Sequence, residues 1–271
     1  MIPINMEGQK NIRDLGNTVT SDGRRIRRGK LIRSGRLSEL SDRDESFLLG
    51  SCRVRTVIDL RTMRETVDRP DPQWAIVEHV RIPLLSDDQM GLSIIRSNGA
   101  AQEKVSILDT LINMTSGPAY TPKQYLTDIY RSFITTKQAQ NATRRFFQTV
   151  FSRKDGAILY HCNGGKDRTG IVTVFLLTML QVPWEEIAAD YMETNVFVRP
   201  WLEQRLENLS GKYRNEQTRA VLRMMYLADE ECLQAAYDKM CDLGGTPEGY
   251  LKQVIGISDF AMEEFRNRML T

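Results

Sequence analysis

The feature that most constrains this chain is a short apolar strand joined to an apolar helix by a loop of glycine and charged residues. Residues 157–160 (Ala-Ile-Leu-Tyr) form an apolar run after a turn signal, and residues 170–180 continue in an apolar helical pattern. Residues 161–169 connect the two, so the chain changes from strand to helix within a few positions. This arrangement predicts an α/β fold in which the helix packs on a sheet.

The other predicted elements agree with a single α/β domain over residues 1–271. Strands are expected mainly before the loop, and helices dominate after it. The expected strands are 30–34, 54–60 and 74–85, and the expected helices are 41–49, 122–135, 138–151, one from Pro183, 201–209, 216–240, 247–254 and 258–270. We therefore predict one α/β domain with a helical C-terminal region packed on it.

Residues 86–122 follow no single period. Asp87, Asp88, the Ser-Asn-Gly run at 97–99 and the Ser-Gly-Pro run at 116–118 interrupt a weakly helical stretch over 103–114. We expect a lid or an insertion in this part of the chain.

Composition describes an ordinary globular protein, with 41% hydrophobic and 27% charged residues. The chain does not open with a basic segment followed by an apolar run, and its longest apolar stretch, 171–182, is too short to span a bilayer. We expect a cytoplasmic protein without integral membrane contact, and export without a signal peptide is left open.

The cysteines do not suggest a disulfide framework, because four in a chain of this length show no paired spacing. Cys52, Cys232 and Cys241 lie in apolar or helical surroundings and are expected to be small buried residues. Cys162 differs because it lies in the loop between strand and helix. This usage favours a reducing compartment.

Positive charge is concentrated in the part of the chain that contains the loop. Residues 1–180 carry 27 Lys and Arg against 19 Asp and Glu, whereas residues 181–271 carry 10 against 16, which suits an anionic substrate. One run has no intervening acidic residue: Arg24, Arg25, Arg27, Arg28, Lys30, Arg33 and Arg36. It is interpreted either as a solvated hairpin face or as a steering patch for phosphorylated or membrane-surface substrates. The lack of interleaved aromatic residues argues against nucleic acid.

The loop itself is suited to hold an anion. It reads His-Cys-Asn-Gly-Gly-Lys-Asp-Arg-Thr over residues 161–169 and ends at a helix start, where backbone N–H groups and the helix dipole favour negative charge. Its glycines permit a tight curve and close approach of the backbone to the anion. We expect a phosphate ion or phosphate group to be bound by Asn163, Gly164, Gly165, Lys166 and Thr169.

The same positive field stabilises a thiolate, so we expect Cys162 to be ionised at neutral pH and able to attack phosphorus. Arg168 is expected to grip two phosphate oxygens with its planar fork, which Lys cannot reproduce. Thr169 is expected to donate a hydrogen bond to the cysteine sulfur and so help it to leave.

Two other interpretations of the loop fit less well. A buried structural cysteine does not explain a Cys-x5-Arg-Thr pattern with two glycines between a strand and a helix. A Walker nucleotide loop needs glycine at position 160 and Ser or Thr at position 167, where this chain has Tyr160 and Asp167.

Residues 161–170 resemble the H-C-x-x-G-K-D-R-T-G signature of the atypical bacterial and fungal protein-tyrosine and lipid phosphatases. The likeness covers nearly the whole chain. It includes Asn-Ile-Arg-Asp-Leu-Gly at 11–16, Leu-Ile-Arg-Ser-Gly at 31–35 with Leu37, Ile-Asp-Leu-Arg at 58–61 followed by Glu65, and Tyr-Met-Glu-Thr-Asn at 191–195. One departure is Asn17, where many relatives carry glycine, but Asn tolerates a positive φ.

The resemblance implies a cysteine-phosphatase fold, in which a parallel-rich central sheet is flanked by helices and a helical lid covers the site. It also implies that Asp167 protonates the leaving oxygen, since the chain has no Trp-Pro-Asp sequence. The alternative for Asp167 is a salt bridge to a neighbouring arginine, such as Arg13 or Arg61. The rival proton donors are Asp71, Asp87 and Asp88.

Some neighbouring residues are candidates of second rank. Asp59 and Arg61 end a predicted strand near the loop, so they are expected to bind substrate or to support the loop. His161 is expected to position Cys162, and His79 to be structural. Two distant histidines without a Cys-x-x-Cys pair give no support for a metal site, and no cofactor is expected.

The residues and the resemblance together lead to a phosphomonoester hydrolase with a phosphocysteine intermediate. Phosphotyrosine is the expected substrate, with phosphoserine, phosphothreonine and phosphoinositides as further candidates, the last because Lys166 adds charge to the loop. An inositol-polyphosphate phosphatase, a sulfurtransferase and a non-catalytic phosphate-binding module are the alternatives. Arg168 and Asp167 argue against the second, and the presence of both Cys162 and Arg168 argues against the third.

Overall fold

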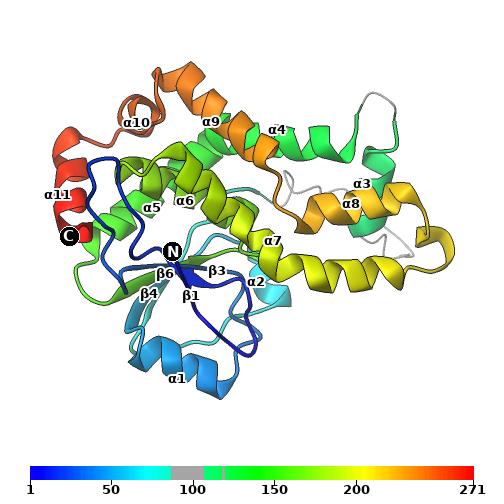
Figure 1. Ribbon diagram of the computed structural model, residues 1–271, viewed down its shortest axis with the longest axis horizontal. Helices are drawn as coiled ribbons and strands as arrows, with labels where there is room; N and C mark the ends of the chain where they lie inside the picture. The colour runs from blue at the N-terminus through cyan, green and yellow to red at the C-terminus, as the bar shows by residue number, and fades with distance from the viewer. Residues whose placement is uncertain (87–106, 118–119) are drawn as a thin grey trace.

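The computed structural model describes residues 1–86, 107–117 and 120–271 (Figure 1). The described strands form one six-stranded sheet in the order β1-β2-β3-β6-β4-β5. The central strands β3, β6, β4 and β5 are parallel to one another, and β1 and β2 add an antiparallel edge. The strand bounds are β1 Ile2–Pro3, β2 Arg13–Asp14, β3 Leu31–Ser34, β4 Val54–Asp59, β5 Glu78–Arg81 and β6 Ala157–His161.

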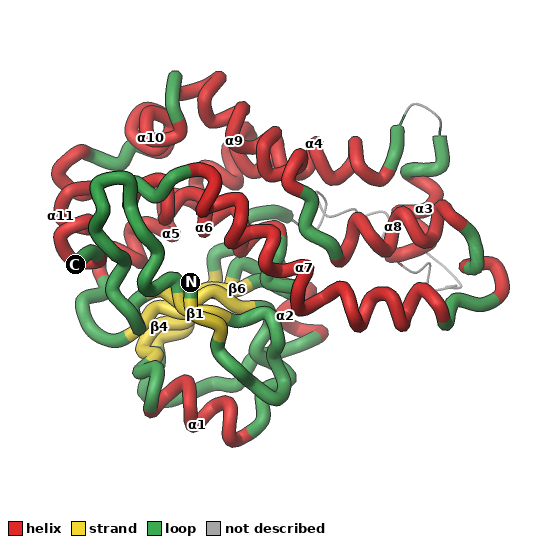
Figure 2. Tube along the Cα trace, in the orientation of Figure 1, coloured by secondary structure: helices red, strands yellow, loops and turns green. Residues whose placement is uncertain are grey.

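Helices cover both faces of this sheet and extend beyond one end of it. Figure 2 shows α1 on one side of the strands and α5 and α6 on the other. The helices are α1 Asp42–Gly50, α2 Met63–Asp68, α3 Ile107–Met114, α4 Pro122–Thr135, α5 Lys137–Ser152, α6 Asp167–Met179, α7 Trp184–Glu207, α8 Glu216–Tyr226, α9 Glu230–Gly244, α10 Pro247–Tyr250 and α11 Asp259–Met269, with a 3-10 turn at Gly211–Tyr213 and a π turn at Leu251–Ile255. The end of α7 projects to the right in Figure 1 together with α3 and α8.

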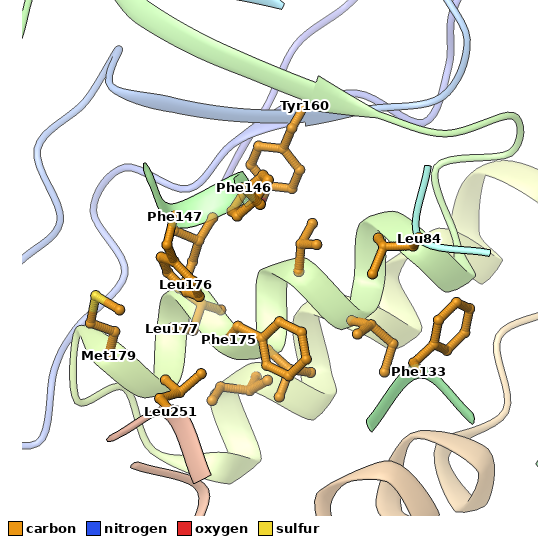
Figure 3. Packing of buried hydrophobic residues seen from close by; sticks show 14 of the residues in the cluster. Leu84, Phe133, Phe146, Phe147, Tyr160, Phe175, Leu176, Leu177, Met179 and Leu251 are labelled. Atoms are coloured by element: carbon orange, nitrogen blue, oxygen red, sulfur yellow. The ribbon is translucent and has the colours of Figure 1, made fainter. Parts of the chain in front are cut away.

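The sheet is buried on both faces, as the alternation of side chains requires. In β6, Ile158 and Tyr160 pack on the side of α5 and α6, whereas Leu159 packs on the side of α1. Helix α6 is buried along nearly its whole length. Figure 3 shows its Phe175 and Leu176 among side chains from α5, β6 and the C-terminal region. This core fixes the loop between β6 and α6 from both ends.

The predicted fold class is confirmed. Three of the expected strands appear at their predicted places, and helices 41–49, 122–135 and 138–151 appear within one residue of theirs. The strand expected over 74–85 is wrong in length, because residues 74–77 form a turn in which Val77 N–H donates to the Trp74 carbonyl at 3.0 Å. Pro83 has no N–H to extend the strand at its other end.

The helical part of the chain differs from prediction at two places. The helix from Pro183 was expected to end before a separate one at 201–209, but α7 runs continuously through Pro200. The helix expected over 216–240 is divided into α8 and α9. The break is held by Asn195 of α7, which donates to the Ala228 carbonyl at 3.0 Å and accepts from the Ala228 N–H at 2.7 Å.

The expected lid over 86–122 is described only in part. Its residues 87–106 and 118–119 lie outside the described residues, and α3 within it packs against α8.

Asn17, near the start of the chain, has φ +67°, as expected for a residue in place of glycine. In the described part of the chain, no helix combines the length and apolar character that crossing a bilayer requires.

Candidate active site

Cys162 lies directly after β6, and Asp167 opens α6, so the loop occupies the carboxyl edge of the parallel strands. This edge is where ligands bind in open α/β sheets. Cys162 is buried, whereas Asn163 and Gly164 are exposed. Helix α6 begins three residues earlier than the predicted Gly170, which places Asp167 and Arg168 in its first turn.

The carbonyl groups of residues 163–165 in the loop are held from outside it. The Asn163 carbonyl accepts from the Arg36 N–H at 3.0 Å. The Gly164 carbonyl accepts from Asn11 Nδ2 at 2.9 Å, and the Gly165 carbonyl from an Arg33 guanidinium nitrogen at 2.8 Å. In a planar trans peptide the following N–H points the opposite way. The N–H groups of residues 164–166 therefore face away from these donors, which is the arrangement of an anion-binding nest.

The two loop glycines have different steric roles. Gly165 has φ +68°, and a Cβ there would lie 2.7 Å from the Gly35 nitrogen and 2.8 Å from the Ser34 carbonyl oxygen. A Cβ at Gly164 would meet nothing within 4 Å. The need for glycine therefore rests on Gly165, which packs directly on the end of β3.

Beneath the loop is a buried cluster of Arg13, Arg33 and Asp190. Arg13 Nε lies 2.6 Å from Asp190 Oδ1, and Arg33 binds the other carboxylate oxygen. Arg13 also donates to Asn11 Oδ1 at 2.7 Å, so both residues that hold the glycine carbonyls belong to the same network. Burial by itself would raise the pKa of Asp190, but Arg33 and Arg13 outweigh it and keep that pKa below its usual range. The cluster carries a net positive charge below the loop.

Arg168 is buried and oriented by Glu65. Its two terminal nitrogens donate to Glu65 Oε2 at 2.5 Å and Oε1 at 2.8 Å. Glu65 is held in turn by Thr62, whose N–H donates to Oε2 at 2.9 Å at the start of α2. A guanidinium has five N–H donors, so this pair leaves three for an anion. Burial would lower the pKa of Arg168, but its hydrogen bonds to Glu65 and the nearby Cys162 and Glu65 outweigh burial and raise it.

Lys166 is not directed into open space. Its ammonium donates to the carbonyls of Met224 at 2.8 Å and Leu227 at 3.0 Å, and it lies 3.1 Å from Asp167 Oδ1. These contacts use its three donors. Lys166 therefore connects the loop to the corner between α8 and α9. The substrate contact expected for it stays a prediction, and it requires the ammonium to leave these carbonyls.

The alternative salt bridges proposed for Asp167 are wrong. Arg13 is bound to Asp190, and Arg61 is bound to Asp59 and Asp71. The ion pair that Asp167 makes is with Lys166.

Thr169 also differs from expectation. Its hydroxyl donates to the Ser34 carbonyl at 3.4 Å instead of to the Cys162 sulfur. It ties the start of α6 to the end of β3.

Asp59 and Arg61 form a buried network with Asp71 and His161 at the side of the loop. Arg61 donates to both carboxylates and to the Arg69 carbonyl. His161 Nε2 lies 3.2 Å from Asp71 Oδ2. Of the two expectations for Asp59 and Arg61, this geometry favours support of the loop over contact with substrate.

Asp71 is a poor proton donor in this network. Burial would raise its pKa, but His161 and Arg61 outweigh burial and lower it, so the carboxyl group is ionised at neutral pH. Asp87 and Asp88 lie outside the described residues. His79 accepts from the Trp74 N–H at 3.3 Å, and burial lowers its pKa, which agrees with a structural role.

Asp59, Asp71 and His161 also have the spacing of metal ligands, with ligand atoms within 4.8 Å of one another. Arg61 donates to both carboxylates and already neutralises them. The donor set therefore fits an ion-pair network better than a cation site.

The basic run expected to be one surface is divided by the fold. Arg25, Arg27 and Arg28 are exposed on the hairpin that follows β2, whereas Arg33 is buried against Asp190. Arg36 lies beside the loop, where it donates to Asn163 Oδ1 at 3.3 Å.

Sequence reasoning gave no role to Asn11, Glu65, Tyr130 and Asp190 and considered Arg33 only as part of the basic run. The structure places all five around the loop. One signal was available, since Arg33 is a charged residue inside an otherwise apolar strand. Such a residue needs a buried partner of opposite charge.

Comparison with known proteins assigns nearly the whole chain to one family. Residues 4–271 match the tyrosine phosphatase family, and the chain belongs to that family. It is thus a protein phosphatase of the α/β class.

Two relatives show how far this likeness extends. The triple specificity protein phosphatase PtpB of Mycobacterium tuberculosis is 29% identical over 98% of both chains. A tyrosine-protein phosphatase of Nostoc commune is 29% identical over 87% of this chain and 71% of its own. A crystal structure of P. aeruginosa TpbA has 15% identity and a TM-score of 0.27, covering 79% of this chain and 89% of that one, which is too distant to add to the argument.

Proposed function

We propose that this phosphatase hydrolyses phosphate monoesters through a phosphocysteine intermediate. The observation that supports this most directly is the outward binding of three successive loop carbonyls, which turns the following N–H groups away from the donors that hold those carbonyls. Arg168 supplies further donors at the same loop. Donors fixed before the substrate arrives stabilise charge on the transferring phosphoryl group without reorganisation.

The proposed reaction has two steps. In the first, the Cys162 sulfur bonds to phosphorus while the bond from phosphorus to the leaving oxygen breaks, and Asp167 gives its proton to that oxygen. In the second, water bonds to phosphorus, its proton passes to the Asp167 carboxylate, and the sulfur–phosphorus bond breaks. The thiolate and the protonated acid are restored, and inorganic phosphate remains in the loop.

Phosphotyrosine in proteins is the proposed substrate, and the cytoplasm the proposed location. The name of the PtpB relative supports a test of more than one phosphoamino acid. Lys166, whose charge suggested phosphoinositides, is bound to Met224 and Leu227. That position favours phosphoproteins over phosphoinositides or inositol polyphosphates as substrates.

The test is a rate comparison on phosphotyrosine, phosphoserine and phosphothreonine peptides and on phosphoinositide vesicles, for wild type and Cys162→Ser. We expect phosphotyrosine to be fastest and the variant to lose about 10³-fold or more, since catalytic groups act as a unit. Inhibition by vanadate but not by EDTA is also expected. Residual turnover above about one per cent in the variant would contradict the nucleophile assignment.

A further inference from the structure

Tyr130 is a fully buried tyrosine of α4 whose hydroxyl reaches the catalytic loop. It donates to Asp167 Oδ1 at 2.8 Å. Lys166 Nζ lies 3.1 Å from the same oxygen. Within the described residues, Asp167 Oδ2 accepts no hydrogen bond, and the Asp167 side chain is 29% exposed. The two oxygens of this carboxyl group are therefore unequal. Oδ1 contacts Tyr130 and Lys166, whereas Oδ2 accepts no hydrogen bond from the described residues.

The hydrogen bonds behind Tyr130 have a fixed direction. Tyr191 of α7 has its hydroxyl oxygen 2.5 Å from that of Tyr130, and the backbone N–H of Asp229 donates to Tyr191 at 3.3 Å. A backbone N–H can only donate and a carboxylate can only accept. Tyr191 therefore donates to Tyr130, and Tyr130 donates to Asp167. Aligned hydrogen bonds polarise one another, so the chain strengthens its last member.

Both tyrosines keep their protons under all ordinary conditions. Burial first, and the nearby charge of Asp167 second, raise the pKa of Tyr130 and of Tyr191 well above the usual range. The chain is therefore a set of neutral donors and does not act as a route for proton loss.

We propose that Tyr130 is a positioning residue for Asp167, which fixes Oδ1 so that the transferable proton resides on Oδ2 and stabilises the carboxylate left after transfer. This inference rests on the proposed function, in which Asp167 gives its proton to the leaving oxygen. Tyr191 acts through Tyr130. Neither tyrosine gives up a proton; the proton that moves is the one on Asp167.

Groups from several elements face Asp167. Lys166 and Arg168 are its charged neighbours in the loop and in α6. Cys232 of α9 also senses its charge, but burial raises the pKa of that thiol, which stays neutral. Tyr130 is the group that donates to Asp167 without carrying charge. Its removal disfavours the carboxylate, so the acid keeps its proton to higher pH.

The experiment compares Tyr130→Phe with wild type on a phosphotyrosine peptide and on an activated aryl phosphate, over a range of pH. We expect the basic limb of the kcat/KM profile to move to higher pH by about one unit, the effect of one hydrogen bond to a charged group. We expect kcat on the peptide to fall about tenfold, and that on the activated ester to change much less, because a good leaving group needs no proton.

Tyr160→Phe is the matched control. Tyr160 is equally buried, but its hydroxyl is paired with Thr173 Oγ1 at 2.8 Å, away from Asp167. Tyr160→Phe should leave the basic limb of the kcat/KM profile in place. Tyr191→Phe should move the limb in the same direction as Tyr130→Phe, by less.

Several outcomes would overturn the inference. Equal loss on both substrates with an unmoved basic limb in Tyr130→Phe would show that Tyr130 only packs. If Tyr130→Phe fails to fold, Tyr191→Phe decides, and an unmoved limb there is contrary to the proposal. Asp167→Asn distinguishes failure of the acid assignment from failure of the inference about Tyr130. If it slows both substrates equally, the acid assignment fails and this inference fails with it. If it spares the activated ester while Tyr130→Phe does not, only this inference fails.

Discussion

Arg168 donates to Glu65 and, in the proposed function, also to the transferring phosphoryl group, so its charge and its shape have separate consequences. Arg168→Lys keeps the positive charge but loses both the paired contacts to Glu65 and the planar fork. We expect kcat on a phosphotyrosine peptide to fall about 10²-fold or more, the usual effect of losing a fixed donor to the transition state, with a smaller change in KM.

Steady-state kinetics of Arg168→Lys and Glu65→Gln check this prediction. Glu65→Gln keeps the shape of the Glu65 side chain and leaves Arg168 in place, so its kcat should fall less than that of Arg168→Lys. Wild-type kcat in Arg168→Lys would mean that the guanidinium does not touch the transferring phosphoryl group.

The two loop glycines offer a second comparison at the residue scale. Gly165→Ala places a Cβ against the backbone of Ser34 and Gly35 at φ +68°, whereas Gly164→Ala points into open space. We expect Gly165→Ala to lower the free energy of unfolding by about 2 kcal/mol or more and Gly164→Ala by about 0.5 kcal/mol or less. Urea denaturation of both variants measures the difference, and equal stabilities would contradict the packing of the loop on β3.

At the scale of elements, local patterns predicted most of the fold. Short apolar runs indicated β3, β4 and β6, an N-cap residue indicated α1, and apolar residues at helical spacing indicated α4 and α5. The corner between α8 and α9 could not be read in this way. It is held by Asn195, which is 33 residues from Ala228, and no helical period reports such a contact.

That corner gives a prediction for Asn195→Ala. The change leaves the N–H and carbonyl of Ala228 without a partner, next to Leu227, whose carbonyl binds Lys166. Unpaired buried groups cost about 1–3 kcal/mol each, so the corner should open more often. Hydrogen exchange of residues 224–232 should become faster, and exchange in the sheet should not change.

Asn208→Ala is the control for this change, because Asn208 lies exposed at the end of the same helix and caps only the Gln204 carbonyl. Unchanged exchange of residues 224–232 in Asn195→Ala would show that the corner is held by apolar packing instead.

At the scale of the whole molecule, the site is assembled from segments far apart in the chain. The sequence predicted the loop itself, since its chemistry is contained in consecutive residues. The supports come from Asn11, Arg33, Glu65 and Asp190, which only the sheet order and the packing of α7 bring together. Their roles depend on partners that no local pattern identifies.

The buried ion cluster links stability of the whole molecule to pH. Because Arg33 and Arg13 lower the pKa of Asp190 in the folded chain, its contribution is present above the unfolded value of about 3.9 and is lost as pH falls through the lower folded value. Asp190→Asn leaves two buried arginines without a counter-charge. We expect it to lower the free energy of unfolding at pH 7 by about 3 kcal/mol or more, and this deficit to shrink as pH falls below about 4.

Urea denaturation of wild type and Asp190→Asn across pH 3–7 measures this deficit. Asp22→Asn serves as the control, since Asp22 pairs with Arg24 at the surface and should change stability little at any pH. The pH dependence of this stability deficit discriminates between the two explanations. If Asp190 acts through its ionised pairs, protonating wild type at low pH removes the same interaction that the mutation removes, so the two proteins converge. If it acts through shape and packing alone, Asn is nearly isosteric, and the small deficit it causes would be the same at every pH.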